Sequence, residues 1–238
     1  MNIEAAKKLA GRAAVDNHVR HGMKVGIGSG STIVYAVERL AERIDAHELH
    51  GIIAVCTSLQ SSLLCREKGI KVSTLDDNRI DGILDVAIDG ADEVDEKLNL
   101  IKGGGGAHAQ EKIVDGCAKE FIVVVDEKKV SGHLGERWAV PVEVIPMAMA
   151  PVTKRLASMG ATPVLRMAVK KMGPVVTDNG NIIIDANFGI IDDPAGLEAK
   201  INNIPGVVEN GIFANMTAVV YVGRENGTLD VKKRPGQK

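Results

Sequence analysis

Aromatic residues are scarce in this sequence: Phe, Trp and Tyr together make up 3% of the 238 residues. So few rings leave few surfaces on which nucleic-acid bases can stack. An excess of positive charge is also missing, since 29 Lys and Arg stand against 31 Asp and Glu, giving a net charge of -2. Without a basic surface to follow a phosphate backbone, we expect no nucleic-acid partner.

Cysteines are few, and long apolar runs are absent. Cys56, Cys65 and Cys117 form no CxxC pair, so they predict reduced thiols and not a disulfide framework. No segment approaches the roughly 18 consecutive apolar residues of a membrane helix, so we expect no membrane partner. The first residues carry Glu and Lys without an apolar run, which predicts no secretory signal. Together these absences predict a cytoplasmic protein.

What is present is typical of a globular protein, with 45% hydrophobic and 25% charged residues. The first half alternates short apolar runs with helical patterns, which predicts an α/β fold with a parallel sheet buried on both faces. The apolar runs are Lys24–Gly28, Ile52–Val55, Lys71–Ser73, Asp85–Ile88 and Phe121–Val125, and the helical patterns include Ser31–Arg43 and Ala107–Lys119.

The second half has a different pattern. Pro141, Pro146 and Pro151 are closely spaced and indicate a crossing between two lobes. Asp178-Asn179-Gly180 predicts a hairpin, and Asp193-Pro194 predicts the start of a helix. Strand patterns at Val207–Phe213 and Ala218–Val222 follow. This half predicts a small α+β lobe.

A glycine- and serine-rich loop, Gly26-Ile-Gly-Ser-Gly-Ser-Thr32, follows the first predicted strand. It is an incomplete dinucleotide motif, and it has no Lys as in a Walker A loop. Free N–H groups and hydroxyls at the start of a helix favour a small anion such as a phosphate. The alternative is a tight turn with a serine cap. Thr57-Ser58, after the second strand, is a similar case with a simple helix cap as its alternative.

An acidic loop, Asp89-Gly-Ala-Asp-Glu-Val-Asp95, begins where another predicted strand ends. Its carboxylates suit metal binding or proton transfer, although the EF-hand pattern is absent. Crowded carboxylates raise one another's pKa, which favours acid–base chemistry. The alternative is a solvated acidic turn.

Four consecutive glycines follow Lys102, and Glu111 lies a few residues further on, near the start of a predicted helix. Such a run is costly in backbone entropy, so a plain packing role is a poor explanation. It allows the main chain to approach a ligand closely, with Lys102 to neutralise negative charge and Glu111 directed toward the same pocket. The alternative is a flexible linker. The six histidines show no HExxH motif, and the pairs His18/His21 and His47/His50 are interpreted as surface residues.

Taken together, these motifs resemble the type A ribose-5-phosphate isomerase family. The resemblance is collinear over essentially the whole chain and rests on GSGST (28–32), DGADEVD (89–95), KGGGGA (102–107) with EKIV (111–114), PVEVIPMA (141–148), DNGN (178–181) and IPGVVENGIFAN (204–215). It implies a Rossmann-like catalytic domain (1–135 plus 217–238) with a smaller ferredoxin-like α+β lobe (136–216). It also implies interconversion of ribose 5-phosphate and ribulose 5-phosphate without a metal or organic cofactor, by a homodimer or homotetramer.

The resemblance also implies roles for particular residues. Glu111 matches the catalytic base, Asp89 and Asp92 the paired aspartates, and Lys102 the active-site lysine. The residues that match substrate-binding positions are Lys7, Ser29, Gly30, Ser31, Thr32, Gly90, Ala91, Gly103, Gly104, Gly105 and Lys129. The chain departs from the family at Gln110, where Arg is frequent, and at Lys128, where Ser is frequent. The choice between Lys128 and Lys129 as a ligand contact therefore stays open.

The residues suit this reaction chemically. One carboxylate, Glu111, can remove the C2 proton and return it at C1. Lys102 and the glycine N–H groups can stabilise the charge that develops on the C1 and C2 oxygens. Ring opening needs an acid–base group, for which Asp89 and Asp92 are both suited.

Two other functions were weighed. A sugar-phosphate sensor of the bacterial repressor type shares this kind of sheet, but the roughly 24 residues before the first strand are too few for a helix-turn-helix. A CoA-transferase-like enzyme would use a glutamate as nucleophile and would be labelled covalently by an acyl-CoA.

Overall fold

The computed structural model describes residues 2–234, which divide into two units. Among these described residues, the first unit comprises 2–90, Gln110–Lys129 and 216–234, and the second comprises Ala91–Ala109 and Val130–Asn215. Residues 235–238, which the sequence assigned to the catalytic domain, lie outside the described residues.

These bounds differ from the sequence-based division, which put 91–109 and 130–135 into the first domain and Met216 into the second. The physical reason is strand pairing. In the second unit, β5 (Glu93–Val94) and β6 (Leu100–Ile101) pair antiparallel, and β6 pairs in turn with β12 (Ile212–Phe213). The acidic loop and the glycine run therefore belong to the unit that holds β12, although the sequence places them between strands of the first unit.

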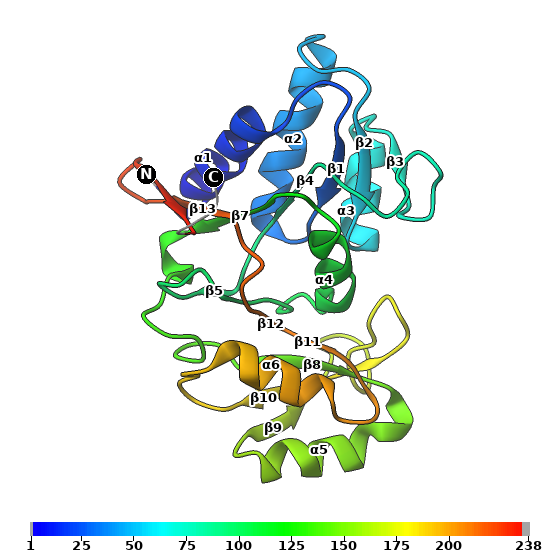
Figure 1. Cartoon of the computed structure of the whole chain (residues 1–238), viewed down its shortest axis with the longest axis vertical. Coiled ribbons are helices and arrows are strands. Elements are labelled where there is room, and N and C mark those ends of the chain that lie inside the picture. The colour runs from blue at the N-terminus through cyan, green and yellow to red at the C-terminus, as the bar shows by residue number, and fades with distance from the viewer. Residues whose placement is uncertain (1, 235–238) are drawn as a thin grey trace. The chain divides into compact units, whose positions relative to one another are not determined.

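A seven-stranded sheet organises the first unit (Figure 1). Its strands are β1 (Lys24–Ile27), β2 (Ile53–Cys56), β3 (Val72–Ser73), β4 (Val86–Asp89), β7 (Phe121–Asp126), β13 (Val219–Gly223) and β14 (Leu229–Lys233). They lie in the order β14-β13-β7-β4-β1-β2-β3, and every pair except the antiparallel β13–β14 is parallel. The strand order reverses direction between β1 and β4, and open sheets of this kind bind ligands beside the carboxyl ends of such strands.

Four helices accompany this sheet: α1 (Ile3–His18), α2 (Ser31–Asp45), α3 (Leu59–Glu67) and α4 (His108–Gly116). The side chain of Asn2 caps α1 by accepting a hydrogen bond from the Ala5 N–H at 3.0 Å. Apolar residues of α2 recur at helical spacing and are buried in the core, among them Ile33, Val37 and Leu40. Helices α1 and α2 pack against one another, as Figure 1 shows.

The second unit contains a four-stranded antiparallel sheet in the order β11-β8-β10-β9. Its elements are β8 (Val140–Val144), α5 (Met149–Ser158), β9 (Thr162–Leu165), β10 (Ile182–Asn187), α6 (Pro194–Asn202) and β11 (Val207–Asn210). The connectivity β-α-β-β-α-β is the ferredoxin-like arrangement, so the predicted fold class is confirmed for both parts of the chain. As predicted, Asp193 caps α6 and accepts a hydrogen bond from the Gly196 N–H at 3.0 Å.

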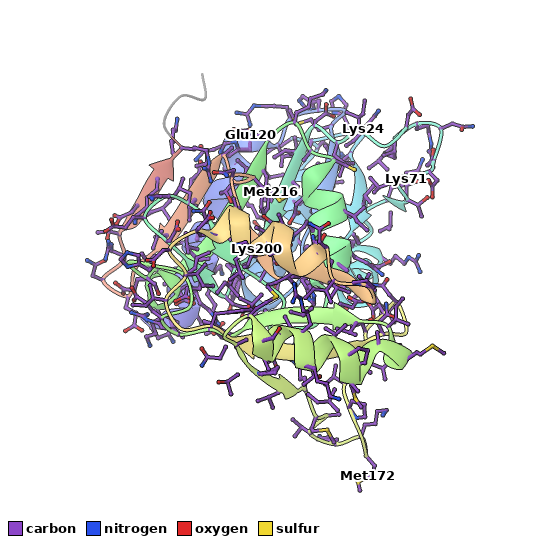
Figure 2. The ribbon with its side chains drawn as sticks, turned by 60° about the horizontal axis from the view of Figure 1, so that its bottom comes forward. Lys24, Lys71, Glu120, Met172, Lys200 and Met216 are labelled. Carbon is purple, nitrogen blue, oxygen red and sulfur yellow. The ribbon has the colours of Figure 1, made fainter. Side chains whose placement is uncertain are left out.

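Other expectations need correction. The predicted strand Val207–Phe213 is divided into β11 and β12 at Gly211, where a side chain would collide with the Lys102 carbonyl. Pro141 lies within β8, opposite Asp185 of β10, and does not mark a crossing. Strands β9 and β14 were not predicted. Figure 2 shows Met172, which is 93% exposed, at the outer end of the loop that joins β9 and β10.

Among residues 2–234, no helix has both the length and the apolar character that a membrane span requires.

Candidate active site

The predicted phosphate loop joins β1 to α2. Gly30 is the N-cap of α2 and has φ +104°, a left-handed value that favours glycine. Its N–H donates a hydrogen bond to Gln60 Oε1 at 3.2 Å. Since a glycine cap has no side chain to accept the N–H groups of the first turn, the start of α2 at Ser31 and Thr32 keeps donors that suit an anion.

The turn between β2 and α3 supports this loop. Ser29 Oγ donates to Ser58 Oγ at 2.6 Å and lies 2.8 Å from Thr57 Oγ1. Ser58 also caps α3, because its Oγ accepts the Ser61 N–H at 3.2 Å. Thr57-Ser58 therefore provides the predicted helix cap and also holds Ser29 in place.

Asp89 is fully buried at the end of β4 and connects two loops. Its Oδ1 accepts hydrogen bonds from the Ser29 N–H at 3.0 Å and from the Gly90 N–H at 2.6 Å. The carboxylate fills the space beside Gly28, where a side-chain carbon would overlap it. The loops after β1 and β4 are thus joined through one carboxylate, which makes Asp89 part of the framework of the phosphate loop.

Glu111 lies in the first turn of α4, and only 6% of the residue is exposed. The partial positive charge at a helix N-terminus favours an ionised carboxylate at this position. Asp115, four residues later on the same face of the helix, is 2% exposed. The spacing of the two acids is visible in the sequence, but Asp115 was not among the predicted site residues.

Two of the predicted lysines lie elsewhere in the first unit. Lys7 is on α1 and forms an ion pair with Glu4 at 2.9 Å. The hydrogen bond from Lys7 lowers the pKa of the Glu4 carboxyl. Lys128 and Lys129 lie in a short 3-10 helix, Glu127–Lys129. Lys128 Nζ contacts Glu225 Oε1 at 2.9 Å, so this lysine is engaged by the turn between β13 and β14.

In the second unit, Lys102 directly follows β6 and is 2% exposed. Its N–H donates to the Gly211 carbonyl at 2.8 Å, and its ammonium lies 5.4 Å from the centre of the Phe213 ring. The ring face attracts the cation, which helps to hold an extended lysine in the protein interior.

The glycine run is an ordered loop and not a flexible linker. Gly103 and Gly106 have φ values of +102° and +80°. A side-chain carbon at Gly103 would lie 2.7 Å from His108 Nδ1. Gly104 and Gly105 are exposed, as main chain that approaches a ligand must be. The Gly104 N–H donates to Asp92 Oδ2 at 2.6 Å, so the run and the second predicted aspartate form one structure.

Arg166 contacts the same run, and the sequence offered no signal for it. Its Nη1 donates to the carbonyls of Gly103 and Gly104, at 2.8 and 3.1 Å. These partners are 63 and 62 residues away in the chain.

The predicted residues thus form two groups. Lys7, Ser29–Thr32, Asp89, Gly90, Glu111 and Lys129 belong to the first unit, and Ala91, Asp92, Lys102 and Gly103–Gly105 belong to the second. Within the described residues, no group of three or more His, Cys, Asp or Glu side chains is arranged to hold a metal ion.

Known proteins are similar to this chain over most of its length. The model of the family described as ribose 5-phosphate isomerase A (phosphoriboisomerase A) matches residues 53–227. Ribose-5-phosphate isomerase A of Thermosynechococcus vestitus is 52% identical over 221 residues, which are 93% of this chain and 92% of that protein. The human ribose-5-phosphate isomerase is 50% identical over 235 residues, which are 98% of this chain and 74% of the human protein.

Solved structures extend the similarity to the fold. A D-ribose-5-phosphate isomerase in complex with phospho-erythronic acid has a TM-score of 0.94 and 46% identity, covering 98% of this chain and 100% of that one. Ribose 5-phosphate isomerase A from Methanocaldococcus jannaschii has a TM-score of 0.91 and 45% identity, with the same coverage.

The fold, with its ligand-binding strand ends, and these relatives together define an aldose–ketose isomerase of sugar phosphates. The chain belongs to the ribose 5-phosphate isomerase A family, and its reaction is the interconversion of ribose 5-phosphate and ribulose 5-phosphate. Membership of this family leaves the sugar-phosphate sensor and the CoA-transferase-like enzyme without support.

Proposed function

We propose that Glu111 is the base of this isomerase and carries one proton between C2 and C1 of the sugar. The observation that supports it is the burial of Glu111, 6% exposed, in the first turn of a helix, where little water competes for the proton. Removal of the C2 proton of the open-chain aldose gives an enediolate, and return of the proton at C1, together with transfer of the hydroxyl proton from O2 to O1, gives the ketose. A single positioned carboxylate performs both transfers on one face of the sugar.

Replacement of Glu111 by Gln tests this role. The amide keeps the size of the side chain but is not basic, so kcat should fall by about 10²–10⁴-fold. Exchange of the substrate C2 hydrogen with deuterated solvent should be lost together with turnover, while calorimetry should still detect sugar-phosphate binding. Glu67→Gln is the matched control, because Glu67 is an exposed glutamate at the end of α3. Exchange at the wild-type rate in Glu111→Gln would place the base elsewhere.

We assign Lys102 to the charge that develops on the C1 and C2 oxygens. A buried ammonium beside a ring face is little screened by water, so its attraction to an enediolate is strong. The N–H groups of Gly103–Gly105 add donors that need no reorganisation during the reaction. Lys102→Met should lower kcat more than it raises KM, since the charge arises only after binding.

The paired aspartates receive different roles in this proposal. Asp89 accepts hydrogen bonds from main-chain N–H groups of the two loops, which supports a part in building the phosphate loop. Asp92 is partly exposed and accepts a hydrogen bond from the Gly104 N–H, which supports a part in opening the sugar ring. Asp89→Asn should therefore raise KM, whereas Asp92→Asn should lower kcat.

We propose that the loop Ser29–Thr32 binds the phosphate group. Donors at the start of α2 support this choice, and binding energy from the phosphate then orients the reacting carbons. Lys7 lies on the helix that packs against the first turns of α2, where Gly11 lies close to Thr32. Lys129 is proposed as the second basic contact because it matches the family's second basic position; Lys128 forms an ion pair with Glu225. Gly90 and Ala91 complete the proposed substrate contacts at the end of β4.

We also propose that the enzyme is a cytoplasmic homodimer or homotetramer. Its three cysteines are free thiols, which suits a reducing compartment. Exposed apolar side chains gather on β9 and the loop after it, including Val164, Met167, Val169 and Met172. Such a patch is typical of an association surface. Light scattering coupled to size-exclusion chromatography tests the proposal, with Val169→Asp expected to shift the wild-type oligomer toward monomer.

A further inference from the structure

Arg166 follows β9 and has contacts that an ordinary surface arginine lacks. Its side chain is 16% exposed. One nitrogen, Nη1, bridges the carbonyls of Gly103 and Gly104 at 2.8 and 3.1 Å. These two carbonyls belong to the glycine run, in which Gly104 and Gly105 are exposed and no residue has a side chain with which to hold itself in place.

Asp185 of β10 holds the other side of the guanidinium. Arg166 Nε donates to Asp185 Oδ2 at 2.9 Å, and Nη2 donates to Asp185 Oδ1 at 2.5 Å. The Arg166 N–H also donates to the Ile183 carbonyl of β10 at 2.9 Å. A two-point pair of this kind fixes the plane of the guanidinium as well as its position. The nitrogen that remains, Nη1, is therefore held toward the glycine carbonyls by a rigid sheet.

The glycine run in turn fixes a carboxylate. The Gly104 N–H donates to Asp92 Oδ2 at 2.6 Å, and a side-chain carbon on Gly104 would lie 2.8 Å from both Asp92 oxygens. Rotation of the peptide groups in the run would turn this N–H away from Asp92. Contacts therefore continue from Asp185 to Arg166, from Arg166 to Gly103 and Gly104, and from Gly104 to Asp92.

We propose that Arg166 is a positioning residue for the isomerisation. It holds the glycine run in the orientation that the proposed roles of its N–H groups and of the Asp92 carboxylate require. This proposal rests on the roles given above to Asp92 and Gly103–Gly105. Arg166 acts through the main chain and does not touch the sugar. Lysine is a poor replacement, because a single ammonium does not bridge two carbonyls and pair with both Asp185 oxygens at once.

The test compares Arg166→Met and Arg166→Lys with Arg155→Met, which changes an exposed arginine on α5 of the same unit. A displacement of reacting groups by about 1 Å costs up to about 10²-fold, so Arg166→Met should lower kcat by about 10–100-fold. KM should stay within about threefold, since the Ser29–Thr32 loop binds the phosphate independently. Arg166→Lys should recover only part of kcat, and Arg155→Met should match the wild type.

Two further measurements separate positioning from a merely structural role. Amide hydrogen exchange of the peptide that contains residues 103–106 should become faster in Arg166→Met at unchanged thermal stability. Ethylguanidinium should restore part of kcat to Arg166→Ala, because it returns the missing donors. Wild-type kcat per folded molecule in Arg166→Met, or unchanged exchange of residues 103–106, would overturn the proposal. If Arg166→Met does not fold, Asp185→Asn replaces it, with the same loss of kcat and faster exchange expected.

Gly104→Val in the intact enzyme distinguishes this proposal from the one on which it rests. If Gly104→Val turns over normally, the glycine run is not part of the active site and the proposed roles fail. If Gly104→Val is inactive while Arg166→Met is fully active, the proposed role of the glycine run is retained and the proposed role of Arg166 is wrong.

Discussion

Gly28→Ala should weaken the fold and the site together. Gly28 directly follows β1, and a side-chain carbon there would overlap the Asp89 carboxylate. Either the packing absorbs the added methyl group or Asp89 moves. Overpacking costs about 1–3 kcal/mol. Movement of Asp89 breaks its hydrogen bonds with the Ser29 and Gly90 N–H groups, and bonds to a charged group contribute about 1.5–3 kcal/mol each.

The less costly of the two responses sets the result, so we expect a loss of about 1–3 kcal/mol. For a chain of this size, each kcal/mol lowers the melting temperature by about 2–4 °C, which gives a decrease of about 2–12 °C. Thermal unfolding followed by circular dichroism measures it. Gly90→Ala is the matched control for stability. Its added carbon would meet the Ser29 and Val124 carbonyls at 3.8 Å, an ordinary contact distance.

A double variant tests the mechanism of this loss. In Asp89→Gly both the carboxylate and the Cβ that lies 2.5 Å from the added carbon are gone, so the addition of Gly28→Ala should cost little more than Asp89→Gly alone. The coupling between the two positions should amount to about 0.5–3 kcal/mol. A Gly28→Ala variant that melts within about 2 °C of the wild type, a shift worth under about 1 kcal/mol, would refute the reasoning.

Three further predictions concern metal ions, the phosphate side and acid stability. Turnover of ribose 5-phosphate should survive EDTA, because a glutamate base needs no Lewis acid; loss of activity restored by Mg²⁺ or Zn²⁺ would contradict this and direct attention to Asp89, Asp92 and Asp95. Lys129→Met should raise KM for ribose 5-phosphate, whereas Lys128→Met should leave it unchanged, because Lys128 is paired with Glu225; initial-rate kinetics in which the two effects are reversed would move the contact to Lys128. The hydrogen bond from Arg12, assisted by Arg39, lowers the pKa of Glu42 from 4.5 to about 2. A depressed pKa stabilises the fold above about pH 4.5, and this contribution is lost as the pH falls from 4.5 toward 2. Since such exposed pairs contribute only about 0.2–1 kcal/mol each, Glu42→Gln should lower the melting temperature slightly at pH 7 and not at pH 2, and equal effects at both pH values would contradict the assignment.

Much of the first unit could be predicted from local sequence. A parallel strand that is buried on both faces must be apolar throughout, so Phe121–Val125 was recognised as a strand without knowledge of its neighbours. The start of α6 at Asp193-Pro194 depends on a side-chain cap within a few residues. The start of α2 at Ser31, within GSGST, follows a glycine cap. The motif residues of the candidate site were found for the same reason, since each lies in a short segment of unusual composition.

Strands β9 and β14, each at the edge of its sheet, were missed because their sequence carries little signal, and the interior strand β8 was missed because Pro141 lies within it. β9 contains Pro163 and has alternating half-exposed residues, and β14 ends in two lysines. Charged residues and proline are common on edge strands, where one side of the ladder faces solvent. Their strand conformation comes from pairing with β10 and β13, partners that no local pattern reveals.

The sequence by itself therefore determined the class of fold, the loops with chemistry and the residues in them, because these depend on periodicity, caps and composition over a few residues. Only the tertiary structure decided that residues 91–109 join the second unit, through pairing of β6 with β12. Only the structure connected Arg166 with Gly103 and Gly104. Both depend on contacts between segments that are far apart in the chain. Every residue has a main-chain carbonyl, so the type of residue does not indicate which hydrogen bonds that carbonyl accepts.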